Sequence, residues 1–242
     1  MRFESTPDPR EQIGVGGYKR AYKVVRADGT PEVQLVMKHQ YTNEQMKGLF
    51  YLNKIATLLF PGKIAAVKQG GNIHGDDGQV VSSQFVSHYV EPDAQHRDIQ
   101  EFATQFDGDM EAAREYDESH GGRLEAITND RYDRLYTDNA IEAFRAAYAA
   151  AGLSNPDGAV QIGWGAQDVV FTKDGDFTFV DVDVPWDEPE DIGADAYTDQ
   201  CLRFVPAKLQ EAINTLSEPK RTQALQYYAR LEEQMRVAGF VV

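Results

Sequence analysis

The chain has 242 residues, 42% of them hydrophobic, and a formal net charge of −15. That length supports one substantial core or two small lobes that share a cleft. The acidic balance repels phosphate backbones and argues against broad nucleic-acid binding. Cys201 is the only cysteine, which excludes a disulfide framework and a cysteine-based zinc site.

The sequence predicts no membrane partner. No run approaches the roughly 18 apolar residues that cross a bilayer, and residues 1–12 lack the apolar core of a signal peptide. We therefore expect a cytoplasmic protein. Its charge is uneven, because residues 1–70 are slightly basic and residues 90–200 hold most of the acid. This fits either a phosphate-binding first part or simply an acidic, solvated surface.

Three strands and a helix are predicted first. The strands are QIGV, AYKVVRA and EVQLVMKHQ between residues 12 and 40, with Asp28-Gly29 as a hairpin turn. Residues 43–60 have helical spacing, with Asn43 as the predicted N-cap and Pro61-Gly62 as the end. Two further strands, IAAVKQ and QVVSSQFVSHYV, are joined by the loop GGNIHGDDG.

The rest of the chain is predicted to be mainly helical. Residues 93–153 are charged, and the apolar spacing of AIEAFRAAYAAAGL indicates a helix. A short β-hairpin is expected near residues 158–184, with its turn at Lys173-Asp174-Gly175-Asp176. From about residue 195 to the end the pattern is helical again.

A glycine-rich turn and a lysine carry the first chemical signal. Residues 13–24 read IGVGGYKRAYKV, and Lys38 ends the apolar run LVMK of the third predicted strand. Glycine has no Cβ, so such a turn lets the backbone approach a phosphate closely, and a lysine on a nearby strand can reach it as a point charge. The alternatives are an ordinary tight turn and a lysine that ends a strand in solvent.

This set resembles the Gly-rich loop and strand-three lysine of the protein-kinase-like superfamily. Three strands, a helix and two strands is also the order of a kinase N-lobe, and Tyr89 then falls at the hinge. The resemblance implies that the glycines cover the phosphates of ATP, the lysine holds the α- and β-phosphates, and hinge backbone groups bind adenine. The implied cofactor-binding residues are Gly14, Gly16, Gly17, Lys38, Tyr89 and Val90.

The second half of the resemblance concerns metal binding. Kinase-like domains place a metal-binding Asp after a short hairpin and a metal-binding Asn thirteen residues earlier. Here Asp181 follows the apolar strand, and Asp168 lies thirteen residues before it, at the Asn position. A carboxylate binds Mg²⁺ at least as well as an amide does. The resemblance thus implies Mg²⁺ on Asp168 and Asp181, with Asp183 assisting the metal or capping a turn.

The catalytic base of the family is missing from its expected position. Five residues before Asp168 the chain has Gly163. Asp157, in the SNPDG turn upstream, is one candidate to substitute, and Asp168 and Asp183 are others. This departure puts phosphoryl transfer to a protein hydroxyl in question.

The helix position that holds a glutamate in the family departs from the family pattern, and a second segment only imitates a family motif. Alignment on Pro61 places Asn53 where the family has the glutamate that pairs with the lysine, and Glu44 is the helix's only acid. Either residue remains a candidate partner of Lys38. The letters His96-Arg97-Asp98 spell the kinase catalytic motif, but they follow the hinge directly and are interpreted as a helix start.

We predict an α+β, two-lobed protein-kinase-like fold of the compact bacterial type related to aminoglycoside phosphotransferases. Its five-stranded N-lobe would span residues 1–90 and its mainly helical C-lobe residues 91–242. The leading hypothesis is an ATP-binding, Mg²⁺-dependent phosphotransferase with an unidentified small-molecule or protein substrate. The alternatives are a pseudokinase that binds nucleotide or a protein partner without transfer, and an acidic interaction protein without nucleotide affinity.

Overall fold

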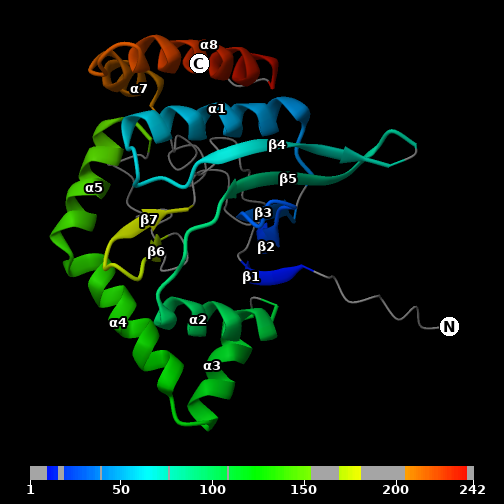
Figure 1. Ribbon diagram of the computed structural model, residues 1–242, viewed down its shortest axis with the longest axis vertical. Coiled ribbons are helices and arrows are strands. Elements are labelled where there is room, and N and C mark those ends of the chain that lie inside the picture. Colours follow the sequence, from blue (N-terminus) through cyan, green and yellow to red (C-terminus); the bar gives the residue numbers. More distant parts are fainter. Residues whose placement is uncertain are drawn as a thin grey trace, which may run out of the picture.

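A computed structural model describes residues 10–15, 19–38, 40–75, 77–107, 109–153, 169–180 and 205–238. Five strands form one antiparallel sheet in the order β1-β2-β3-β5-β4. Figure 1 shows this sheet beneath helix α1, with the remaining helices around it. The strands are β1 (Glu11–Val15), β2 (Lys19–Val25), β3 (Pro31–Met37), β4 (Val67–His74) and β5 (Val80–His88).

Helix α1 (Asn43–Leu59) connects β3 to β4 and begins one residue earlier than predicted. The N-cap is Thr42, not Asn43, because Thr42 and Gln45 form a capping box. The Gln45 backbone N–H donates to the Thr42 hydroxyl, and the Thr42 N–H donates to the Gln45 side chain. The helix ends before Pro61-Gly62 as predicted, with Gly62 at φ 80°.

Strand β4 runs through residues that the sequence assigned to a loop. The segment Gly70-Gly71-Asn72-Ile73-His74 continues the strand and pairs with β5. Gly70 lies opposite Phe85, and a Cβ at Gly70 would come within 2.2 Å of the Phe85 ring. Glycine is therefore present because the ring packs against the strand, not because the chain turns.

The remaining described elements are mainly helical, as predicted. Helix α2 starts directly after the Tyr89–Pro92 linker, with Asp93 as its N-cap, so the segment His96-Arg97-Asp98 is a helix start. Two short strands form the predicted hairpin, although residues 154–168 and 181–204 lie outside the described residues. The elements are α2 (Ala94–Gln105), α3 (Met110–Ser119), α4 (Arg123–Thr137), α5 (Asn139–Ala150), β6 (Val169–Phe171), β7 (Phe177–Phe179), α7 (Pro206–Asn214) and α8 (Lys220–Val237).

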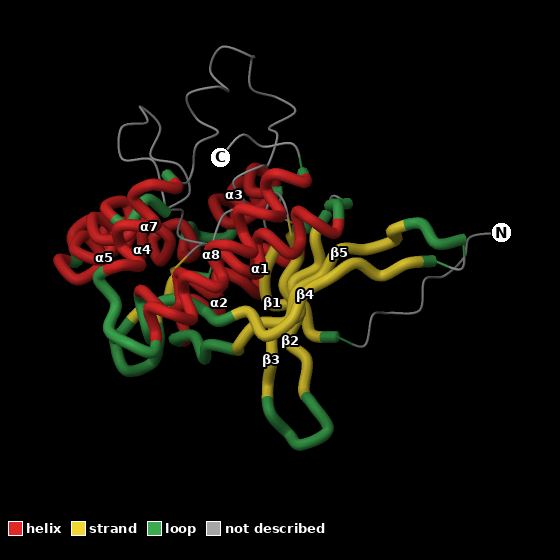
Figure 2. The backbone as a smooth tube through the Cα atoms, turned by 90° about the horizontal axis from the view of Figure 1, so that it is seen from above, coloured by secondary structure: helices red, strands yellow, loops and turns green. Residues whose placement is uncertain are grey.

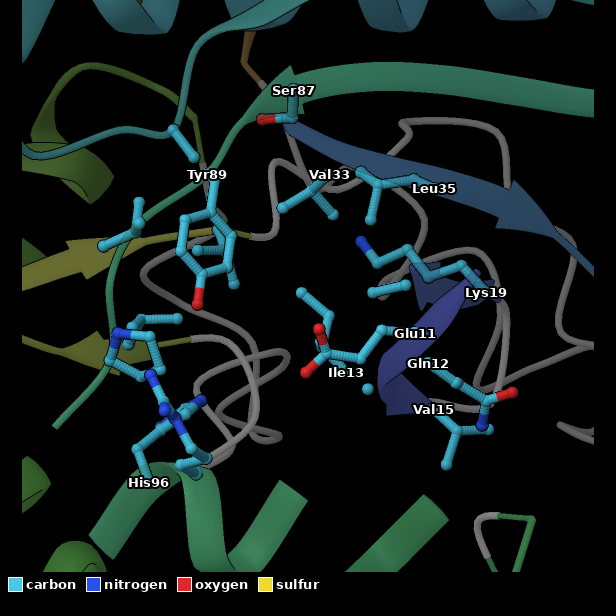
Figure 3. A pocket seen from close by; sticks show the side chains of 18 of the residues that line it. Glu11, Gln12, Ile13, Val15, Lys19, Val33, Leu35, Ser87, Tyr89 and His96 are labelled. Carbon is cyan, nitrogen blue, oxygen red and sulfur yellow. The ribbon is translucent and has the colours of Figure 1, made fainter. Parts of the chain in front are cut away.

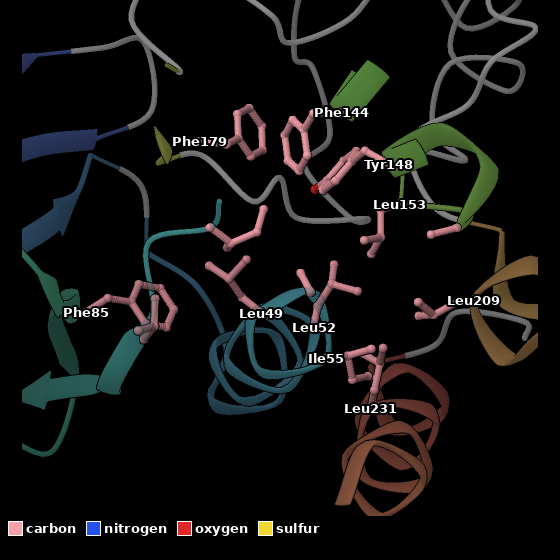
Figure 4. Close-up of a cluster of buried hydrophobic side chains, with 14 of the residues drawn as sticks. Leu49, Leu52, Ile55, Phe85, Phe144, Tyr148, Leu153, Phe179, Leu209 and Leu231 are labelled. Atoms are coloured by element: carbon pink, nitrogen blue, oxygen red, sulfur yellow. The ribbon is translucent and has the colours of Figure 1, made fainter. Parts of the chain in front are cut away.

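Helices α7 and α8 cover α1 on the side away from the sheet (Figure 1). Leu209 and Leu231 are fully buried in the same apolar cluster as Leu52 and Ile55 of α1 (Figure 4). The cluster extends to the β6–β7 hairpin, so one core joins the sheet's helix to the rest of the molecule. Burial of such side chains is the main stabilising contribution to this arrangement.

The predicted α+β class is confirmed, with a five-stranded sheet and a mainly helical remainder. Figure 2 shows the strands gathered on one side of the molecule and most helices on the other. A lobe boundary at residue 90 stays a prediction, and α8, assigned to the second lobe, packs on α1 of the first. No helix within the described ranges has the length and apolar composition to cross a membrane.

Candidate functional site

A cavity of about 450 Å³ lies between the sheet, the β5–α2 linker, α2 and the β6–β7 hairpin. Figure 3 shows side chains converging on it from these separate elements. The sheet contributes residues from β1, β2 and β3, and the hairpin contributes Val170 and the adjoining Val180. The cavity therefore has the position of a cleft between a sheet and the chain that follows it.

Strand pairing determines which side chains form the sheet wall of this cavity. Ala21 of β2 lies opposite Leu35 of β3, and Lys23 lies opposite Val33. Directly opposed residues of an antiparallel pair lie on the same face of a sheet. Val33, Leu35 and Ala21 all line the cavity, and their apolar surface suits a flat, uncharged group.

The linker forms the edge of the cavity and is held from both sides. The Lys23 Nζ lies 4.6 Å from the centre of the Tyr89 ring, which ties the linker to β2. The Asp93 N–H donates to the Phe171 carbonyl at 2.9 Å, which ties it to β6. Tyr89 and Val90 both line the cavity, and their role as a nucleotide-binding hinge stays a prediction.

The Glu91 carboxylate secures the outer side of the linker. It accepts from Lys173 on the hairpin turn at 3.2 Å and pairs with Arg97 on α2. The hydrogen bond from Lys173 is the main reason why the pKa of Glu91 lies below its usual value. These exposed contacts hold the linker, the hairpin and α2 together at the cavity mouth.

A buried histidine from α2 lies at the lower wall of the cavity. His96 is 5% exposed, and its Nδ1 accepts from Arg131 Nη2 of α4 at 2.5 Å. An arginine can only donate, so the imidazole proton is assigned to Nε2. Burial, with the Arg131 charge second, lowers the pKa of His96 to about 3. His96 is therefore a neutral, fixed group at physiological pH.

Arg131 connects this wall to the hairpin. Its Nη2 also donates to the Val169 carbonyl at 3.4 Å, and its guanidinium lies 5.7 Å from the centre of the Phe171 ring. Burial lowers the pKa of Arg131 to about 10, so the side chain stays charged at neutral pH. The pair thus fixes α2, α4 and β6 with respect to one another.

The structure brings some of the sequence-predicted residues together. Gly14, Tyr89 and Val90 line the cavity. Lys38 follows β3, is exposed, and is not among the described residues that line the cavity. Residues outside the described ranges are Gly16, Gly17, Asp157, Asp168, Asp181 and Asp183.

The two candidate partners of Lys38 are placed elsewhere. The Asn53 side chain is buried, donates to the Ala65 carbonyl at 3.0 Å and accepts from the Val67 N–H at 2.8 Å. Both ends of its amide therefore hold the segment before β4 against α1. Glu44 lies half-buried in the first turn of α1, and within the described part of the chain no hydrogen bond or ion pair joins it to Lys38.

Sequence reasoning missed Glu11, Lys19 and His96 as cavity-lining residues. For Lys19 a signal was present, because it lies an even number of residues from Ala21 and Lys23 on β2 and so shares their face. His96 carried no such signal, since its burial depends on Arg131 from a distant helix. Within the described ranges, no group of three acidic, histidine or cysteine side chains has an arrangement that would hold a metal ion.

No protein-family model matches this chain, and no curated protein matches its sequence. Among solved structures it is similar to a pseudokinase in its apo form, at 11% identity and a TM-score of 0.33, over 93% of this chain and 88% of that one. It is also similar to the MAP kinase LmaMPK10 from Leishmania major, at 11% identity and a TM-score of 0.32, over 90% of this chain and 60% of that one. Likeness at this level carries no argument about ligands or activity.

Proposed function

We propose that the cavity binds ATP and that the protein is a kinase-like phosphotransferase of the compact type. The observation that carries the proposal is the cavity itself, enclosed by the sheet, the linker and the hairpin. Its apolar wall of Ala21, Val33 and Leu35 suits a purine, and the adjacent linker offers backbone groups for hydrogen bonds. The resemblance found in the sequence supports the same ligand independently.

The proposed ligand contacts follow the chain. Tyr89 and Val90 would bind the base through backbone atoms, while the glycine turn would cover the phosphates. Gly14 already lines the cavity. Gly16 and Gly17 lie in the sequence between Gly14 and Lys19, where β2 begins, and would complete the proposed turn.

The proposed Mg²⁺ ligands are Asp168 and Asp181, with Asp183 as a third candidate. Asp168 directly precedes β6, and Asp181 directly follows Val180, which lines the cavity. Val169 and Phe179 are opposed in the hairpin, so the chain enters and leaves it at neighbouring points. This register supports a shared site for carboxylates that stand just beyond its open end. Bound Mg²⁺ would neutralise phosphate charge.

The proposal has two forms, an enzyme that transfers phosphate and a nucleotide-binding protein that does not. Asp157 or Asp168 would act as the base in an active enzyme, and positioning would supply most of the rate enhancement. The second candidate is a nucleotide-binding pseudokinase. The observation that favours it is Gly163 at the position where the family has its base.

Calorimetry with Mg²⁺–ATP tests the binding proposal on the wild type and two variants. Ala21→Phe fills the cavity from the middle of β2, whereas Tyr22→Phe alters the adjacent residue, which is not among the residues lining the cavity. We expect binding by the wild type and Tyr22→Phe, and loss of binding in Ala21→Phe. No heat at millimolar ATP in any of the three refutes the proposal and favours the interaction protein.

Turnover of bound ATP then separates the enzyme from the pseudokinase. In an active enzyme, Asp168→Asn and Asp181→Asn should each lower ATP turnover strongly while leaving adenosine binding intact. A wild type that binds ATP but shows no turnover above these variants is a pseudokinase.

A further inference from the structure

We infer that Lys19 on β2, and not Lys38, is the cation that holds the phosphates of the bound nucleotide. The inference rests on the proposed function, because it names the charged contact of the same cavity. It departs from the sequence expectation, in which Lys38 of the third strand has that role.

The register of β2 and β3 places Lys19 on the cavity side of the sheet. Lys19 lies opposite Met37, two residues along from the pair formed by Ala21 and Leu35. Side chains two residues apart share a face of a strand. Ala21 and Leu35 line the cavity, and Lys19 lines it as well. Figure 3 shows the Lys19 side chain extending from β2 toward the middle of the cavity.

The same register separates Lys38 from this face. Val33 and Leu35 face the cavity, so the next residue of β3 on that face is Met37, whose side chain is 9% exposed and part of the core. Lys38 is one residue further along, beyond the end of β3, and is exposed. A lysine at residue 37 would have met the family pattern, and this chain has methionine there.

Lys19 also lies at the correct end of the cavity for a phosphate. The linker end of β2 is marked by Lys23, whose Nζ lies over the Tyr89 ring. Lys19 lies four positions before Lys23, which is about 13 Å along a strand. A purine against the linker would therefore extend its phosphates toward Lys19 and the adjoining glycine turn.

Lys19 is the cation in this part of β2 whose side chain lines the cavity. Glu11 is opposed to Lys23, so its negative charge belongs to the linker end of the cavity, where ribose hydroxyls would lie. Arg20 has the opposite parity to Lys19 and forms a two-oxygen ion pair with Asp107, with Nη2 at 2.9 Å from each carboxylate oxygen. Arg20 is therefore committed to the α2–α3 turn.

The test measures binding of ATP and of adenosine by calorimetry to the wild type, Lys19→Gln and Lys38→Gln. Adenosine reports the cavity without the phosphate contact. We expect Lys19→Gln to weaken ATP binding by roughly tenfold or more, as for loss of a charge-assisted hydrogen bond. Adenosine affinity should be unchanged in Lys19→Gln, and both affinities should stay within about twofold of wild type in Lys38→Gln. Lys19→Arg should retain most of the ATP affinity.

Three outcomes overturn the inference, and they differ from failure of the proposed function. Weakened ATP binding in Lys38→Gln but not in Lys19→Gln would return the role to Lys38. An equal loss of ATP and adenosine affinity in Lys19→Gln would mean that Lys19 only shapes the cavity. An unchanged ATP affinity in both variants would mean that neither Lys19 nor Lys38 contacts the phosphates. If the wild type binds neither ligand, the proposed function itself fails.

Discussion

Replacing His96 by asparagine should flatten the dependence of stability on pH on the acid side of neutrality. His96 is buried beside the Arg131 guanidinium, and its pKa in the folded protein is about 3. In the unfolded chain a histidine titrates near pH 6.5. Between about pH 3 and pH 6.5 the histidine is protonated in the unfolded chain but stays neutral in the folded protein. The contribution of neutral His96 to stability is therefore fully present above about pH 6.5 and is lost as the pH falls toward 3.

The magnitude follows from the separation of the two pKa values. Each pH unit below about 6.5 removes about 1.4 kcal/mol, so the loss between pH 7.5 and pH 5 is about 2 kcal/mol. That loss is a large part of the usual 5–15 kcal/mol of a folded domain. Arg131 keeps its charge throughout this range, since its own pKa is about 10. The Asp93 carboxylate, which accepts from the His96 N–H, belongs to the helix cap and is retained in the variant.

Urea unfolding at several pH values between 5 and 8 measures the effect, with circular dichroism and fluorescence as two probes. In His96→Asn the Oδ1 atom can accept from Arg131 in place of Nδ1, and no group titrates there. The difference in stability between wild type and variant should therefore shrink by about 2 kcal/mol from pH 7.5 to pH 5. His74→Asn, which removes an exposed histidine at the end of β4, serves as the matched control. If the difference in the free energy of unfolding between wild type and His96→Asn does not change with pH, the low pKa of His96 is refuted.

Three further predictions concern packing and buried hydrogen bonds. Gly70→Ala should destabilise the protein by ~1–3 kcal/mol, because the new Cβ meets the Phe85 ring; Gly71→Ala, with nothing within 4 Å of its Cβ, should cost less in the same urea titration. Asn53→Ala should cost ~1–3 kcal/mol, since it strands the Val67 N–H and the Ala65 carbonyl; an unchanged unfolding midpoint would contradict this. Leu231→Ala should cost ~2–5 kcal/mol, as the residue is fully buried against α1; a thermal midpoint equal to that of the exposed control Leu225→Ala would contradict it.

Local signals predicted the elements well wherever the chemistry was local. The Asp28-Gly29 turn, the helix after residue 42 and the start of α2 just before His96 each depend on neighbouring residues. The errors arose where the structure of a segment depends on a residue far away in the sequence. Gly70 was interpreted as part of a loop, and only the Phe85 ring on the neighbouring strand explains why a glycine fits inside β4.

The site was predicted less completely, for a related reason. The glycine turn and the linker are each continuous in sequence, and their order along the chain led to Gly14, Tyr89 and Val90, which line the cavity. Nucleotide binding by these residues stays a prediction. Which lysine faces the cavity depends on the alternation of side chains along a strand. Met37 lies on the same face as Val33 and Leu35, whereas Lys38 is one residue further along and is not on that face. The buried pair of His96 and Arg131 joins two helices and has no sequence pattern of its own.

The packing of α8 on α1 has a consequence for how the chain is made. Helix α1 leaves the ribosome well before α8, because a long stretch of chain separates the two helices. Until then the face of α1 that includes Ile55 has no cover from Leu231. The nascent sheet and its helix must therefore wait for a contact between distant parts of the chain, which slows folding and exposes apolar surface. A chain ended before residue 205 should remain in this unfinished, aggregation-prone state.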